Sequence, residues 1–137
     1  MRTVLTYGTF DLLHVGHVRL LHRAADLGDR LIVGVSTDQF NQKKGKTCVM
    51  PFEDRCELVA ACRVVDQVFA ENDWSQKETD AVRLQADVFV MGDDWIGHFD
   101  FMKKYCEVVY LPRTPGISTT EIKSYIGERS LDLSIAR

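Results

Sequence analysis

The hydrophobic residues of this chain form five short runs that are apolar throughout rather than alternating with polar residues. Runs of this kind are typical of parallel strands whose two faces are both covered by helices. The predicted strands are Val4–Tyr7, Leu31–Val35, Val68–Ala70, Val88–Met91 and Val108–Leu111.

Between the predicted strands, apolar residues recur at helical spacing. These residues are Val18, Leu20, Leu21, Ala24, Ala25 and Leu27, then Leu58, Val59 and Cys62, and more weakly Ala81, Val82 and Leu84. Strands that alternate with helices predict an α/β fold of one domain with a doubly wound parallel sheet. Ligands of such sheets bind outside the carboxyl ends of the strands, so we expect the chemistry there.

Composition narrows the classes of function. The chain has 137 residues and a formal net charge of -3, which disfavours a nucleic-acid binder. No apolar run approaches the ~20 residues of a membrane span, and the N-terminus enters a strand without a signal-peptide layout. The four cysteines show no C-x-x-C pairing, so we expect reduced, structural thiols and a cytoplasmic location.

Two histidines lie where the first predicted strand passes into a helix. His14 and His17 flank Gly16, which would let the backbone approach a ligand closely. A helix start presents free N–H groups and a positive dipole end, which favour a phosphate and a neutral imidazole at His17. Metal binding is the alternative, but no further His/Cys cluster completes a tetrahedral site, so we expect no metal ligands in the chain.

A second polar helix start follows the last predicted strand. In residues 113–121, Arg113 precedes a glycine turn, and Ser118 or Thr119 can cap the next helix with Glu121 completing a capping box. Capping alone would explain these residues. It is also compatible with binding, because a hydroxyl-rich helix start beside an arginine can hold a phosphate.

Other basic residues are ambiguous from the sequence. Lys43, Lys44 and Lys46 follow the second predicted strand, either as a solvated loop or as a mobile clamp on phosphates. Gly45-Lys46-Thr47 is not a P-loop, because Phe40 stands where that motif needs its first glycine. Arg55 and Arg63 flank a helical stretch on which both could point to a similar side, and surface ion pairing would explain them equally well.

The H-x-G-H at His14–His17 and the Arg113-Thr114-x-Gly116-Ile117-Ser118-Thr119-Thr120 segment together resemble the signatures of the cytidylyltransferase family. Further matching stretches include Tyr7–His14, Ser36–Asp38 and Val88–Trp95. The resemblance covers nearly all of residues 1–126, the expected domain, and leaves residues 127–137 as a C-terminal tail. It implies a Rossmann-like fold and a homodimer.

The resemblance implies transfer of CMP from CTP to sn-glycerol 3-phosphate, which gives CDP-glycerol and pyrophosphate with Mg²⁺ or another divalent cation. The products of such enzymes supply teichoic-acid or capsule-like polymers in bacteria. Matching positions imply catalytic roles for His14, His17, Arg63 and Arg113. They imply nucleotide binding by Thr9, Phe10, His14, Gly16, His17, Lys46, Asp94, Arg113, Thr114, Gly116, Ile117, Ser118, Thr119 and Thr120. Acceptor binding is expected of Lys44, Lys77, Asp11 and Arg55.

Three alternatives remain open at this point. The first is a nucleotidyltransferase that uses ATP, or CTP with another phosphorylated alcohol. The second is a dinucleotide-binding oxidoreductase, although Gly8 and Gly16 do not form G-x-G-x-x-G. The third is a nucleotide-sensing module without turnover.

Overall fold

The five predicted strands all form, and they build one parallel sheet with the order β3-β2-β1-β4-β5. The computed structural model describes residues 1–135, with side chains described through residue 128. The strands are β1 (Thr3–Gly8), β2 (Arg30–Ser36), β3 (Gln67–Glu71), β4 (Val88–Gly92) and β5 (Glu107–Leu111). The chain runs outward from β1 to β3 and then returns to the other side of β1, so the order reverses between β1 and β4. The predicted doubly wound fold is therefore confirmed.

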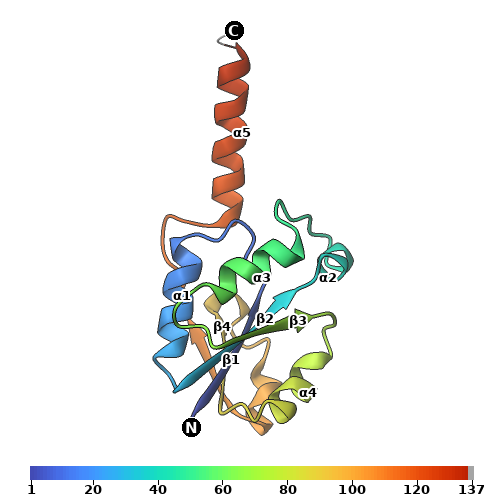
Figure 1. Ribbon diagram of the computed structural model, residues 1–137, viewed down its shortest axis with the longest axis vertical. Coiled ribbons are helices and arrows are strands. Elements are labelled where there is room, and N and C mark those ends of the chain that lie inside the picture. The colour runs from blue at the N-terminus through green and yellow to red at the C-terminus, as the bar shows by residue number, and fades with distance from the viewer. Residues whose placement is uncertain (136–137) are drawn as a thin grey trace.

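Helices cover both faces of the sheet, as Figure 1 shows. They are α1 (Val15–Ala25), α2 (Asp38–Lys43), α3 (Phe52–Ala60), α4 (Gln76–Arg83) and α5 (Thr119–Ile135), with short 3₁₀ turns η1 (Asp93–Trp95) and η2 (Asp100–Lys104). Successive residues of β1 point to opposite faces. Val4 packs with Leu21 and Val59 of α1 and α3, whereas Leu5 packs with Ala81 and Met102 on the α4 and η2 side.

The predicted helices form where they were expected, but the end of one helix was misplaced and another helix was not predicted. Cys62 lies in the turn beyond α3, although it still packs against the core. The basic segment after β2 is not only a loop, because Thr37 caps α2 by accepting the Phe40 N–H and Lys43 is the last residue of that helix. Apolar periodicity did not predict α2, because its six residues bury one apolar side chain, Phe40, beside the polar Asn41.

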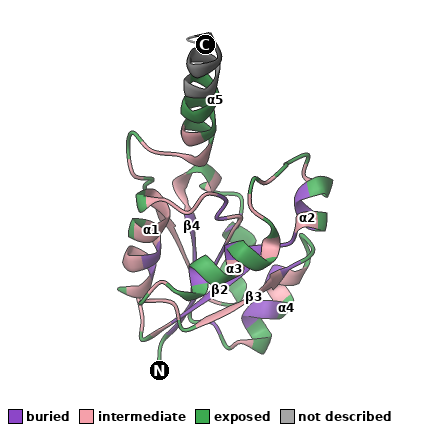
Figure 2. Cartoon of the chain, turned by 45° about the horizontal axis from the view of Figure 1, so that its top comes forward, coloured by how far each residue is buried: buried purple, intermediate pink, exposed green. Residues whose placement is uncertain are grey.

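Helix α5 projects away from the sheet, and its residues 123–128 are exposed (Figure 2). It continues without a break across residues 126 and 127, where the expected domain gives way to the expected tail. Residues 136 and 137 lie outside the described part of the chain. Within residues 1–135, no helix has the length and apolar character needed to cross a membrane.

Candidate active site

A cavity of about 510 Å³ opens at the point where the strand order reverses. The carboxyl ends of β1 and β4 form its floor, through Tyr7, Gly8, Met91 and Gly92. The starts of α1 and α5 form its walls. This is the place at which doubly wound sheets bind their ligands.

The two histidines are arranged by their own backbone. His14 caps α1, and its Nδ1 accepts the Gly16 N–H at 3.0 Å. The Nδ1 of His17 accepts the His14 N–H at 3.1 Å. Because each Nδ1 is an acceptor, the neutral rings carry their proton on Nε2. His17 lines the cavity and His14 stacks on it, with ring centroids 3.8 Å apart.

Both rings are held neutral near pH 7. Burial, together with the neighbouring His14, lowers the pKa of His17 to about 4. Burial also lowers the pKa of His14, although Glu121 opposes this shift. Neutrality at His17 was predicted from the helix start, but burial is the larger cause. The pair therefore offers N–H donors without adding a net charge.

Gly16 is required by the close approach of its neighbours. A Cβ built on Gly16 would lie 2.8 Å from Cε1 and 2.9 Å from Nδ1 of His14, and 3.2 Å from Cγ2 of Ile117. The residue thus lets the His14 ring fold back over α1 and lets the segment before α5 approach it. The backbone before α1 is also unusual, because Phe10 and Leu12 have φ angles of 55° and 51°. Strained backbone of this kind concentrates at functional sites.

The start of α5 meets the loop between β1 and α1. Ser118 caps the helix by accepting the Glu121 N–H at 3.1 Å, which confirms half of the expected capping box. The Thr119 hydroxyl donates to the Asp11 carbonyl at 2.8 Å. These contacts bring the two predicted signals, 108 residues apart at Asp11 and Thr119, to the same cavity.

The structure collects most of the residues expected to bind nucleotide. The cavity is lined by Thr9, Phe10, Gly16, His17, Lys46, Asp94, Arg113, Thr114, Ile117, Thr119 and Thr120. Gly116 and Ser118 lie just outside the lining, where a φ of 78° at Gly116 and the Ser118 cap shape the helix start. Arg113 and Asp94 form an exposed ion pair of 3.4 Å across the mouth.

Arg55 and Asp11 both have partners within the chain, and their expected role in acceptor binding stays a prediction. Arg55 is fully buried and donates to the carbonyls of Thr9, Ser36 and Met50, with Asp38 as its ion-pair partner. Arg55 and Arg63 could have pointed to a similar side of one helix, but α3 ends at Ala60, and Arg63 is exposed on the following turn whereas Arg55 is buried.

The Asp11 carboxylate accepts the N–H groups of Val49 and Met50 at 2.8 and 3.0 Å. It also pairs with Lys123 at 3.2 Å. Burial would raise the pKa of Asp11, but these hydrogen bonds and the ammonium hold it below its ordinary value. Asp11 therefore anchors residues 49 and 50 instead of presenting a free carboxylate.

Lys44 and Lys77 lie in a neighbouring cluster outside the cavity lining. The Lys77 ammonium is buried, pairs with Glu71 and lies 5.5 Å from the centre of the Trp74 ring. Lys44 packs over the Phe40 ring at 4.4 Å, and burial lowers its pKa. Arg63 is exposed on the turn after α3, away from the cavity lining. The roles of these three residues stay predictions.

The described residues contain no group of three or more His, Cys, Asp or Glu side chains placed to hold a metal ion. The two carboxylates of the cavity are Asp11 and Asp94, and both are paired with cations of the chain.

Several further side chains line the cavity without having been expected there, among them Arg23, Thr47, Trp95 and Lys123. Arg23 also donates to the Pro112 carbonyl at 2.7 Å. A signal existed for Lys123, which lies four residues after Thr119 and so on the same face of a helix. No sequence signal pointed to Arg23, because Pro112, its hydrogen-bond partner, is 89 residues away in the chain.

Known proteins resemble this chain over most of its length. The model of the family described as cytidylyltransferase-like matches residues 5–125. The chain is 56% identical over 126 residues to the glycerol-3-phosphate cytidylyltransferase of Bacillus subtilis, covering 92% of this chain and 98% of the relative. It is 55% identical over 123 residues to the Staphylococcus aureus protein of the same name, covering 90% and 93%.

Among solved structures, the lipopolysaccharide core biosynthesis protein of Thermoplasma volcanium superposes with a TM-score of 0.75. It is 24% identical and covers 83% of this chain and 98% of its own, so it supports the fold alone. Fold, site and relatives together define a nucleotidyltransferase. Within that class, the chain belongs to the cytidylyltransferase-like family.

Proposed function

We propose that this protein transfers CMP from CTP to sn-glycerol 3-phosphate and releases CDP-glycerol and pyrophosphate. One observation carries the proposal. The neutral His17 ring, on which the neutral His14 ring stacks, and the hydroxyl-rich start of α5 line one cavity at the switch point of the sheet. The two relatives above, whose names give this activity, support the choice of nucleotide and acceptor.

The charge of the cavity suits a triphosphate. Four cationic side chains line it, against two carboxylates, although the whole chain is negative at -3. The cations are Arg23, Lys46, Arg113 and Lys123. An electropositive cleft in an otherwise acidic protein concentrates an anionic substrate locally.

The reaction needs no general base. A phosphate monoester has a second pKa of about 6, so the acceptor is largely dianionic at neutral pH and its oxygen can attack directly. That oxygen forms a bond to the α-phosphorus of CTP, and the bond from this phosphorus to the pyrophosphate oxygen breaks. The protein must align two anions and stabilise the charge that accumulates on the α-phosphate.

His14 and His17 fit that task. Their Nε2–H groups are donors whose rings are fixed by backbone hydrogen bonds, so little reorganisation is needed. We assign them to the α-phosphate and the bridging oxygen. Lys46 and Arg113 balance the triphosphate, and the Arg113–Thr120 segment holds it. On binding, Arg113 exchanges Asp94 for phosphate, which frees Asp94 to face the nucleoside.

We assign Lys44 and Lys77 to the acceptor phosphate, because their ammonium groups lie in one aromatic-walled cluster beside the cavity. Mg²⁺, or another divalent cation, belongs to the substrate as Mg·CTP and would neutralise phosphate oxygens. Arg63 is exposed in a single chain, so an activity role for it fits the expected homodimer better than an isolated subunit. The unpaired cysteines and the use of CTP support a cytoplasmic location.

The decisive experiment measures pyrophosphate release by the purified protein with Mg·CTP and sn-glycerol 3-phosphate. Ribitol 5-phosphate and phosphocholine replace the acceptor in parallel reactions, and ATP replaces CTP. We expect release with CTP and glycerol phosphate at least about tenfold faster than in any other pair, with CDP-glycerol identified by mass. Faster release with another acceptor would overturn the acceptor, and CTP binding without release would favour the nucleotide-sensing alternative.

A further inference from the structure

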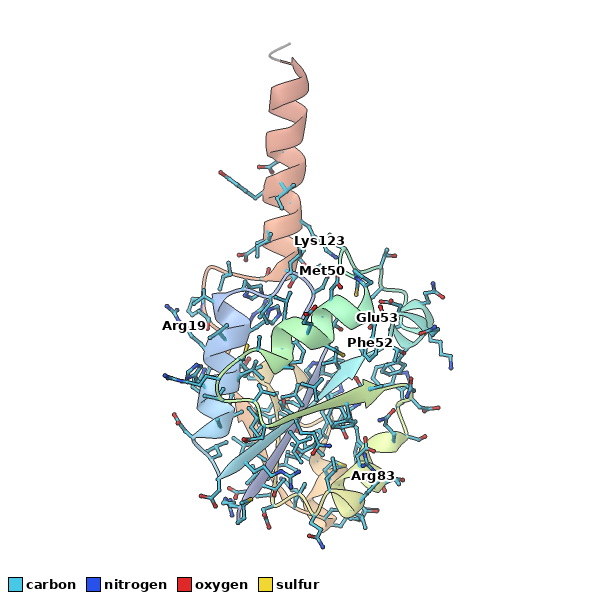
Figure 3. The ribbon with its side chains drawn as sticks, viewed as in Figure 1. Arg19, Met50, Phe52, Glu53, Arg83 and Lys123 are labelled. Atoms are coloured by element: carbon cyan, nitrogen blue, oxygen red, sulfur yellow. The ribbon has the colours of Figure 1, made fainter. Side chains whose placement is uncertain are left out.

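Lys123 on the first turns of α5 connects segments that are far apart in the sequence. Its Nζ lies 3.2 Å from the Asp11 carboxylate and donates to the Thr47 carbonyl at 3.1 Å. Figure 3 shows Lys123 beside Met50, where α5 meets the segment that leads into α3. We propose that Lys123 is a positioning residue that clamps residues 44–51, the segment between α2 and α3, against the start of α5. Its coupling to nucleotide rests on the proposed function.

The 44–51 segment is also tied to α2 and α3. The Lys46 N–H donates to the Asn41 carbonyl, and the Asn41 side-chain amide donates to the Cys48 sulfur. The Met50 carbonyl accepts from Arg55 of α3. Beyond Lys123, its contacts with the loop before α1 are the two N–H groups of Val49 and Met50, which donate to Asp11. Asp11 is thus shared between the segment and Lys123. Removal of the ammonium would leave the Thr47 carbonyl without this donor and Asp11 without its counter-ion.

The other end of the clamp is the helix start itself. Thr119 lies one turn before Lys123, and its hydroxyl donates to the Asp11 carbonyl. Both residues therefore contact Asp11 from the same face of α5. The helix therefore cannot move relative to the loop before α1 without loosening these contacts. A triphosphate held at Arg113–Thr120 would fix the helix, and through Lys123 it would fix the 44–51 segment.

This segment supplies part of the cavity wall. Lys46, Thr47 and Cys48 all line the cavity, and Thr47 is the residue that Lys123 holds. The position of the Lys46 ammonium therefore depends on a contact made by α5. In this arrangement, binding at the start of α5 brings the adjoining 44–51 segment into place, which is a population shift toward the clamped position of the segment.

Cys48 gives a direct readout of segment opening in the complete, unmodified chain. The protein is pulse-labelled with iodoacetamide and alkylation of Cys48 is quantified by peptide mass spectrometry. Cys106, which lies after η2 and contacts the Met102 carbonyl, is the internal reference. We expect Lys123→Met to accelerate Cys48 labelling by about fivefold, from loss of a partly exposed ion pair and one hydrogen bond, with Cys106 unchanged.

Two matched variants control the interpretation. Lys123→Arg keeps the charge and donors, and we expect labelling within about twofold of the unsubstituted chain. Lys104→Met removes an exposed lysine of η2 that packs over Tyr105, and we expect no change. Saturating CTP should slow Cys48 labelling in the unsubstituted chain and do so less in Lys123→Met. KM for CTP should rise about fivefold in Lys123→Met, with a smaller change in kcat.

An unchanged rate of Cys48 labelling in Lys123→Met would overturn the proposed clamp. If the KM for CTP rose in that variant while the labelling rate stayed the same, Lys123 would contact the nucleotide without positioning the segment. Equal effects of Lys123→Arg and Lys123→Met would also overturn it. Labelling of the free protein does not depend on which acceptor is used. Failure of the proposed function would instead appear as absent product with the unsubstituted chain.

Discussion

The imidazole rings of His14 and His17 stack at an interplanar angle of 25°, and the backbone N–H of His14 donates to the ring of His17. The two side chains are therefore a unit. His14 caps the helix on which His17 lies, and a charge on His14, together with burial as the larger cause, lowers the pKa of His17. A change at either residue should disturb both donors.

Removal of either donor should abolish most of the activity. We expect His14→Ala and His17→Ala to lower kcat by about a hundredfold or more, the usual effect of losing a positioned donor to a developing charge. His14→Ala should also cost about 1 kcal/mol of stability as a lost N-cap. Steady-state kinetics and urea unfolding separate the two effects. His22→Ala, on the same helix but outside the cavity lining, should retain its kcat, and near-normal kcat in both site variants would refute the assignment.

The neutral histidines make stability depend on pH in a definite direction. The pKa of His17 is about 4 in the folded chain, against an ordinary value of 6.5 when unfolded. Between these values the unfolded state binds more protons, so the free energy of unfolding falls as pH drops from about 6.5 toward 4. Urea unfolding at pH 7.5 and pH 5.0 should show a larger loss in the unsubstituted chain than in His17→Gln.

Titration of Asp11 does not contribute to the difference in stability between pH 7.5 and pH 5.0. Hydrogen bonds and Lys123, acting against burial, hold its pKa below its ordinary value of 3.8, so its contribution to stability is lost at lower pH. Equal pH dependence in the unsubstituted chain and in His17→Gln would show that His17 is not held neutral.

Gly16→Ala should separate activity from stability. A methyl group 2.8 Å from Cε1 of His14 must displace that ring, so we expect kcat to fall at least about tenfold through the loss of its alignment. A Gly-to-Ala change within a helix otherwise favours the fold by about 0.5–1 kcal/mol. Gly127→Ala is the matched control, since a Cβ there meets nothing within 4 Å. Normal kcat in Gly16→Ala would show that the contact is easily relieved.

Substitutions of Arg55 and Arg63 should have contrasting effects on stability. Arg55→Met leaves three carbonyl acceptors and Asp38 without their donor, so we expect about 3 kcal/mol or more of lost stability in urea unfolding. Arg63→Ala removes an exposed side chain and should change stability by less than about 0.5 kcal/mol. A loss of kcat in Arg63→Ala at unchanged stability would support its expected role in activity, and unchanged kcat would remove that role.

Much of the fold could be predicted from the sequence because its signals are local. The apolar run before Gly8 determined β1, and its burial on both faces requires a parallel sheet with helices on each side. The strand-to-helix passage at His14 and the polar helix start at Ser118 are each set by a few neighbouring residues. Even α2 carried a local signal, its Thr37 cap, although six residues are too few for an apolar period to show.

Only the tertiary structure decided which of these signals meet. The order of the strands placed the ends of β1 and β4 side by side, and this brought Thr119 to Asp11 across 108 residues. The same packing buried Arg55, whose pattern on the helix was compatible with an exposed surface, and gave Lys123 its two partners. Hydrophobic spacing specifies which face of an element is covered, but the identity of the covering residue depends on long-range packing, which no local window of sequence contains.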